Sequence, residues 1–145
     1  MRRVKPAGQI LVMLPFIASM LLLVLAAGIV LGRIAMANAD IQRAADAAAL
    51  AAAANVDVPL WRDQRRLAYS ASAYQVAQAQ ASANASYLRA QGIPVVVTQL
   101  WLEPGGQRAY VSVSADIQSL LPSFLPYSGS MARMGVAQTR MERGP

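Results

Sequence analysis

The hydrophobic residues of this chain are concentrated in one block near the N-terminus. Ile10–Leu31 (ILVMLPFIASMLLLVLAAGIVL) is apolar almost throughout, and no charged residue lies between Lys5 and Arg33. As an α-helix, these 22 residues would span roughly 33 Å at about 1.5 Å per residue, which is enough to cross the hydrocarbon core of a membrane. The pattern predicts a transmembrane helix over residues 9–33, preceded by a short basic stub at residues 1–8.

The helical pattern continues beyond this block. Alanine dominates residues 34–55, and the stretch IQRAADAAALAAA (41–53) contains eight alanines in thirteen positions. Alanine is the strongest helix former, but each methyl group buries little apolar area. No proline interrupts the chain between Pro15 and Pro59. We therefore predict one continuous helix from about residue 9 to residue 55, with 34–55 as a narrow neck that neighbouring helices can approach closely.

A second helix is predicted after this neck. Asp57 or Val58 stands where an N-cap is expected, and Pro59 suits an early helical position. Apolar positions that recur every seven residues predict that this helix runs over 59–91. Gly92 then provides the expected C-terminal cap.

The next segment has the alternating pattern of β-strands. Strand-forming residues over 95–103 and 108–116 flank PGGQ (104–107), which predicts a hairpin. The second strand places small apolar residues on one face: Ala109, Val111, Val113 and Ala115. Residues 120–129 are predicted to form a loop and 131–141 a third antiparallel strand. Residues 56–145 are therefore expected to form an α+β domain.

Charge indicates how the chain would lie in a membrane. Only 14% of the residues are charged, against about 25% in average globular proteins. Arg2, Arg3 and Lys5 precede the apolar block, so the positive-inside rule places the N-terminus in the cytoplasm and the chain beyond residue 34 outside it. The remaining basic residues are scattered along the chain. We therefore expect membrane lipid, and no nucleic acid, as a partner.

Catalytic and metal-binding motifs are missing from the sequence. The chain contains no cysteine and no histidine, and its seven acidic residues show no catalytic spacing. Neither G-x-S-x-G nor S-x-x-K occurs. We expect a protein without enzymatic activity, without a cofactor and without a metal site.

Two N-terminal segments resemble a known family. GQILVMLPF (8–16) and GIVLGRIAMANADIQRAADAAALAAAANV (28–56) are similar to the start of TadG-like and TadE-like proteins of tight-adherence (Flp-type) pilus assembly. The resemblance covers about the first 55 residues, and the rest matches only loosely. The positions that carry it are Pro15, Gly32, Arg33, Gln42, Ala45, Asp46, Ala49 and Leu50.

The resemblance implies a pilin-like α+β fold in which a long transmembrane helix continues into an extracytoplasmic domain. It implies a structural component of pilus assembly, or of related secretion machinery, in the bacterial inner membrane. Its partners would be other pilus-assembly or pilin proteins. A pseudopilin-like minor pilin, cleaved between Gly8 and Gln9 and built into the fibre, is one alternative. Family members processed in this way usually carry Glu five residues after the glycine, where this chain has Met13.

Another alternative is an exported soluble binding protein, cleaved near Ala37 or Ala39. The length of the apolar block favours retention in the membrane instead. Gly28 and Gly32 form a G-x-x-x-G pattern that allows helices to pack closely in lipid, so a homo-oligomer is a further expectation. The full set of small residues proposed for helix packing is Gly28, Gly32, Ala37, Ala44, Ala48 and Ala51.

Overall fold

The N-terminal helix is continuous, as predicted. The computed structural model describes residues 7–64, 67–103, 108–120 and 129–139, without the side chains of residues 7–12, 58, 61 and 119. In it α1 (Ala7–Ala54) is a single helix of 48 residues. Pro15 lies inside the helix, beyond its first turn, so its missing backbone N–H removes one helical hydrogen bond without ending the helix.

The chain divides into two compact units, Met1–Ile34 and Ala35–Pro145. The first contains the apolar part of α1. The second contains the remainder of α1 together with the other helices and the strands. The alanine-rich residues expected to form a neck therefore belong, from Ala35 onward, to the same compact unit as the sheet.

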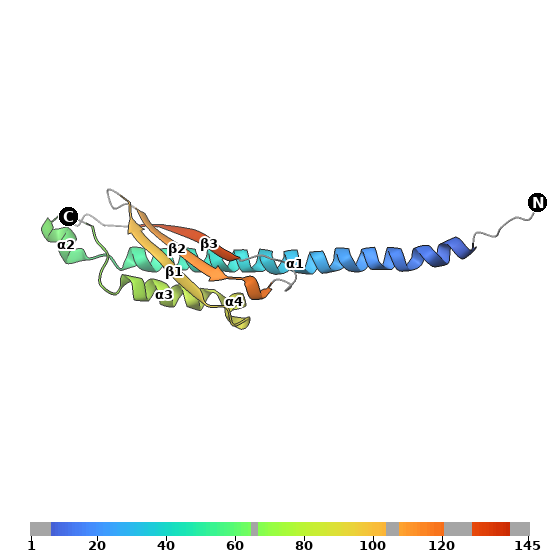
Figure 1. The fold of residues 1–145 in the computed structure, drawn as a ribbon. Coiled ribbons are helices and arrows are strands. Elements are labelled where there is room, and N and C mark those ends of the chain that lie inside the picture. The colour runs from blue at the N-terminus through green and yellow to red at the C-terminus, as the bar shows by residue number, and fades with distance from the viewer. Residues whose placement is uncertain (1–6, 65–66, 104–107, 121–128, 140–145) are drawn as a thin grey trace, which may run out of the picture. The chain divides into compact units, whose positions relative to one another are not determined.

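Three antiparallel strands form one sheet in the order β1-β2-β3 (Figure 1). They are β1 (Val95–Leu102), β2 (Arg108–Asp116) and β3 (Ser130–Gln138). The predicted hairpin and third strand are both confirmed, although the predicted turn at 104–107 and most of the loop at 120–129 lie outside the described residues. A short 3-10 turn, η1 (Gln118–Leu120), follows β2.

The core of the second unit lies between the sheet and the helices. The four small residues predicted to share one face of β2 are all buried. Val111, Val113 and Ala115 pack in one cluster with alanines of α1 and of α3 (Ala73–Asn84), and α3 lies along β1 (Figure 1). The structure thus confirms the α+β class.

The prediction of one helix over 59–91 is wrong. The segment contains three short helices instead: α2 (Val58–Gln64), α3 and α4 (Ser86–Ala90). Between α2 and α3 the chain runs alongside the residues that follow α1. Tyr69 forms an isolated bridge with Val56, and the Ser70 N–H donates to the Asn55 carbonyl at 3.0 Å. Serine hydroxyls compete for backbone groups in such a segment, which favours the turn before α3.

The predicted caps are confirmed at both ends of this region. Asp57 Oδ1 accepts a hydrogen bond from the Leu60 N–H at 3.0 Å, as expected of an N-cap residue of α2. Gly92 has φ of +72°, and the Ile93 N–H donates to the Leu88 carbonyl at 2.9 Å. This Schellman arrangement needs the left-handed conformation that glycine adopts without strain.

Candidate functional site

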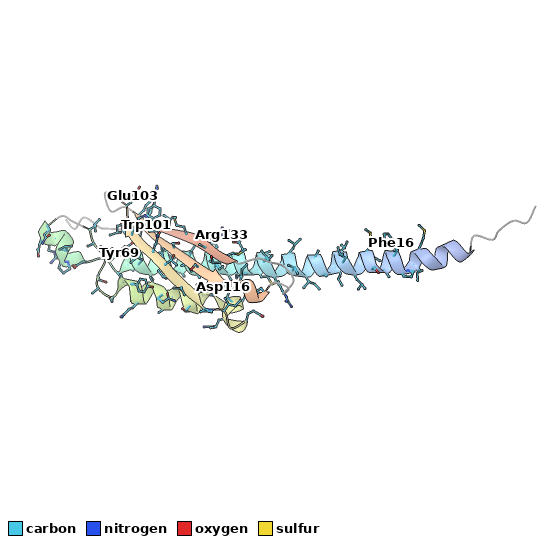
Figure 2. The ribbon with its side chains drawn as sticks, viewed as in Figure 1. Phe16, Tyr69, Trp101, Glu103, Asp116 and Arg133 are labelled. Carbon is cyan, nitrogen blue, oxygen red and sulfur yellow. The ribbon has the colours of Figure 1, made fainter. Side chains whose placement is uncertain are left out.

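The N-terminal part of α1 presents large apolar side chains to its surroundings. Each is more than half exposed, and Figure 2 shows Phe16 standing out from the helix. By length and composition α1 is able to cross a membrane. The exposed side chains are Met13, Leu14, Phe16, Ile17, Met20, Leu21, Leu22, Leu23, Val24, Leu25, Ile29 and Leu31.

The C-terminal part of α1 has the opposite character. Six alanines and one isoleucine, three or four positions apart, form a fully buried row that is called here the alanine face: Ala37, Ile41, Ala44, Ala45, Ala48, Ala49 and Ala52. Gly135 of β3 lies directly over Ala45, so a Cβ on Gly135 would overlap the Ala45 carbonyl group and the Asp46 backbone nitrogen. The alanines therefore let a strand backbone touch a helix backbone.

Polar contacts fix β3 on this helix. Arg133 Nε donates to Asn38 Oδ1 at 2.6 Å, and Gln42 Nε2 reaches the Met134 carbonyl at 3.4 Å. Gln42 also donates to Asp46 at 2.9 Å. The approach of β3 to α1 thus rests on small side chains at its centre and on amide and guanidinium groups beside them.

The residues proposed for helix packing fall into two groups. Ala37, Ala44 and Ala48 are buried in the chain's own core and Ala51 is half-buried, whereas Gly28 and Gly32 are exposed. Nothing lies within 4 Å of a Cβ built on either glycine. Contact of any of these residues with a partner helix stays a prediction.

The positions that carry the family resemblance also differ in their burial. Ala45 and Ala49 belong to the alanine face, while Arg33, Asp46 and Leu50 are exposed. Leu50 is 66% exposed, which is unusual for a leucine on a helix that packs against a sheet. Gly8 and Gln9, the proposed cleavage positions, lie at the beginning of α1.

Asp40 is a site residue that sequence reasoning did not identify. Its side chain is 2% exposed, and its Oδ2 accepts a hydrogen bond from the Leu88 N–H in the first turn of α4 at 3.0 Å. The residue before α4 is Ala85, which has no side chain able to cap, so Asp40 caps this helix from 48 residues away. The signal was its spacing, three residues after Ala37 and four before Ala44, which places it beside these small residues on one side of the helix.

Side chains of α3 form hydrogen bonds with backbone groups on the edge of β1 that faces away from β2. Gln78 of α3 donates to the Val95 carbonyl and accepts from the Val97 N–H, each at 2.8 Å. Tyr74 Oη donates to the Val97 carbonyl at 2.8 Å.

Tyr69 Oη donates to the Trp101 carbonyl at 2.9 Å, near the end of the sheet where Glu103 lies (Figure 2). Burial raises the pKa of Tyr69 to about 12 from its ordinary value of 10.0, because the phenolate is poorly solvated there. Sequence reasoning did not anticipate these tyrosine and glutamine contacts, since they depend on which side of β1 faces α3.

The contacts described at these sites are packing contacts and hydrogen bonds. Within the part of the chain that the structure describes, no three His, Cys, Asp or Glu side chains are grouped to hold a metal ion. The surfaces of interest are therefore the exposed apolar helix, the exposed side of the alanine-rich segment and the two edges of the sheet.

Comparison with known proteins bears on α1. Residues 8–55 match the family model described as "Putative Flp pilus-assembly TadE/G-like", which covers α1 almost from end to end. No curated protein matches the chain, and no solved structure does. The match supports a role in pilus assembly. Residues 8–55 of this chain are thus similar to the TadE/G-like proteins of Flp pilus assembly.

Proposed function

We propose that the protein is a non-enzymatic, membrane-anchored component of Flp-type pilus assembly or of related secretion machinery. One observation carries the proposal: the family match coincides with α1, which is apolar and exposed over its first half and packed into the sheet over its second. A helix of this kind can hold a folded unit at a membrane. No step of chemistry is required for such a role.

The anchor is proposed to lie in the bacterial inner membrane with its N-terminus in the cytoplasm. The basic residues before the apolar block support this orientation through the positive-inside rule. The folded unit from Ala35 onward would then face the periplasm or the exterior. There the exposed side of α1, which includes Met36 and Leu50, is available to other pilus-assembly or pilin proteins.

The first experiment is the intact mass and N-terminal sequence of the native protein recovered from membranes, combined with pilus counts in a deletion strain. We expect a chain that begins at Met1, resists alkaline extraction, and restores pili when expressed from a plasmid. A chain that begins at Gln9 and is found in sheared fibres would instead identify a minor pilin. A soluble chain that begins near Asn38 would contradict membrane anchoring and leave the exported binding protein.

A further inference from the structure

The two edges of the sheet differ in how many of their outward backbone groups form hydrogen bonds with side chains. At β1, the side chains of Gln78 and Tyr74 occupy the outward backbone groups of Val95 and Val97. At β3, the contact to an outward group among the described residues is the 3.4 Å bond from Gln42 to the Met134 carbonyl. An exposed edge strand is a template for pairing with another strand, and proteins usually block it. Among the described residues, side chains therefore block the edge of β1, and at the edge of β3 they contact the Met134 carbonyl alone.

The geometry of β3 identifies which of its groups face the open side. In an antiparallel ladder, the N–H and C=O of alternate residues point to the same neighbour. Val97 directs its N–H and C=O away from β2, toward α3, so its partner Val113 directs its own groups toward Arg133 of β3. The backbone groups of the alternate residues Ala132, Met134 and Val136 therefore face outward. Arg133 and Gly135, opposite Val113 and Val111, face β2.

The side chains at this edge have a distinct chemistry on each face. Met134 and Val136 lie on the face away from α1 and are each 50% exposed. Arg133 lies on the face toward α1 and is exposed, with its Nε held by Asn38. Among the described residues the ion pair is that of Arg43 with Asp40, at 4.0 Å, and Arg133 has no carboxylate partner. The edge therefore combines open backbone groups, an apolar outer surface and an oriented cation.

We propose that the β3 edge binds an extended segment of a partner protein by β-strand addition, with a Glu or Asp of that segment opposite Arg133. Main-chain hydrogen bonds to Ala132, to Val136 and to the N–H of Met134, whose carbonyl already accepts from Gln42, supply the affinity in this mode of recognition, and side chains supply the specificity. Apolar residues on the outer face of the incoming strand would cover Met134 and Val136. A carboxylate on its inner face would form a charge-assisted bond with the guanidinium of Arg133.

Charge complementarity favours a different protein over a second copy of this chain. The β3 strand (SMARMGVAQ) contains Arg133 and no acidic residue, so a second β3 cannot supply the carboxylate. The edge of β1 cannot supply a strand either, because Gln78 and Tyr74 already occupy it. This inference concerns the sheet alone and stands independently of the role proposed for α1.

The test measures amide hydrogen exchange by NMR on the full chain in detergent micelles. The probe is a synthetic nine-residue peptide of alternating Val and Thr with one central Glu, and the matched control carries Lys in place of Glu. We expect the Glu peptide to slow exchange at Ala132, Met134 and Val136 by about tenfold or more. Exchange at Arg133 and Gly135 should not change, since those amides already bond to β2.

Substitutions in β3 test whether the peptide binds at this edge. The substitution Met134→Pro removes an outward N–H that the ladder with β2 does not use, and should abolish binding while thermal unfolding of the chain is little changed. Val136→Pro repeats the test if the first variant unfolds. Arg133→Glu should reverse the preference, so that the Lys peptide binds more tightly than the Glu peptide.

Three outcomes would overturn the proposal. Protection of the three outward amides in the free chain that disappears on dilution would identify a second copy as the occupant. Equal binding of the Glu and Lys peptides would remove the role of Arg133. No protection by either peptide at millimolar concentration would show that the edge does not accept a strand.

Discussion

The two halves of α1 form one helix but differ in which side chains are buried: the first half exposes large apolar residues, and the second buries small ones. Between Met13 and Leu31 the large apolar residues other than Val30 are the exposed ones, each with more than half of its surface accessible. From Ala37 to Ala52 the buried residues are mainly alanines, and exposed positions include Arg43, Asp46 and Leu50. A helix in a water-soluble protein normally buries its large apolar residues.

The difference follows from what each half must contact. Lipid accepts large apolar side chains without a packed partner, so the first half needs bulk and hydrophobicity. The second half must admit a strand whose Gly135 touches the backbone of Ala45, and there bulk would separate the two. Alanine serves because it keeps the helix regular while it takes up little space.

The largest effect is expected from adding bulk at the contact between α1 and β3. A valine at Gly135 would overlap the Ala45 backbone, which cannot move without breaking helical hydrogen bonds. We expect Gly135→Val to lower the free energy of unfolding by about 3 kcal/mol or more, measured by thermal unfolding of the full chain in detergent. Gly28→Ala is the control, because nothing lies near that position and the folded unit should be unaffected. Unchanged unfolding of Gly135→Val would mean that β3 does not approach the helix so closely.

A charge introduced into the exposed half of α1 should reduce membrane insertion and leave the unfolding free energy of the folded unit unchanged. Leu22 is 66% exposed, and replacing it by arginine near the centre of the apolar block costs about 3 kcal/mol in membrane insertion. We expect Leu22→Arg to reduce the fraction of chain recovered in alkali-resistant membranes, while Leu22→Ala is recovered like the wild type. Equal recovery of both variants would argue against a membrane environment for this half.

Two acidic residues on α1 allow a matched comparison within the second half. Asp40 is buried and caps α4, whereas Asp46 is exposed and bonded to Gln42. We expect Asp40→Ala to cost about 2 kcal/mol of unfolding free energy, since the Leu88 N–H loses its partner inside the protein. Asp46→Ala should cost less than about 0.5 kcal/mol. Urea unfolding of both variants measures the difference, and equal losses would contradict the capping role.

The smallest effect is a pH dependence of the unit Ala35–Pro145, into which the second half of α1 packs. The raised pKa of Tyr69 means that the folded chain holds this proton more tightly than the unfolded chain, where the pKa is near 10.0. Its contribution is fully present below pH 10 and is lost as the pH rises through about 12. We expect the urea midpoint to fall across this window. Tyr69→Phe should flatten that fall, and an unchanged slope in the variant would exclude Tyr69 as its source.

Much of this architecture was predictable from local sequence. The bounds of α1 follow from an apolar block joined to alanines with no proline between Pro15 and Pro59, and the hairpin follows from alternation around PGGQ. Asp57 and Gly92 were recognisable as caps because these two caps depend on neighbouring residues alone. Elements of this kind need no knowledge of the rest of the fold.

Features that join distant parts of the chain were not predicted. Nothing near residue 69 in the sequence indicates pairing with Val56, and this pairing interrupts the expected helix. The capping of α4 by Asp40 and the blocking of β1 by Gln78 likewise depend on tertiary placement. Gly135 was detectable in principle, since a glycine inside a strand often marks a close approach of another backbone.

The packing of β3 on α1 also sets an order of events during synthesis. Asn38 and Arg133 are separated by 95 residues, so the ribosome completes nearly the whole folded unit before its last strand reaches the helix. Until then the face of α1 that receives β3 lacks this cover, and pairing over such a sequence distance is slow because a long loop must close first. The newly made protein therefore passes through an interval in which quality-control proteases and chaperones can reach α1, and mutations that delay the last strand would reduce the amount of protein before they altered its final structure.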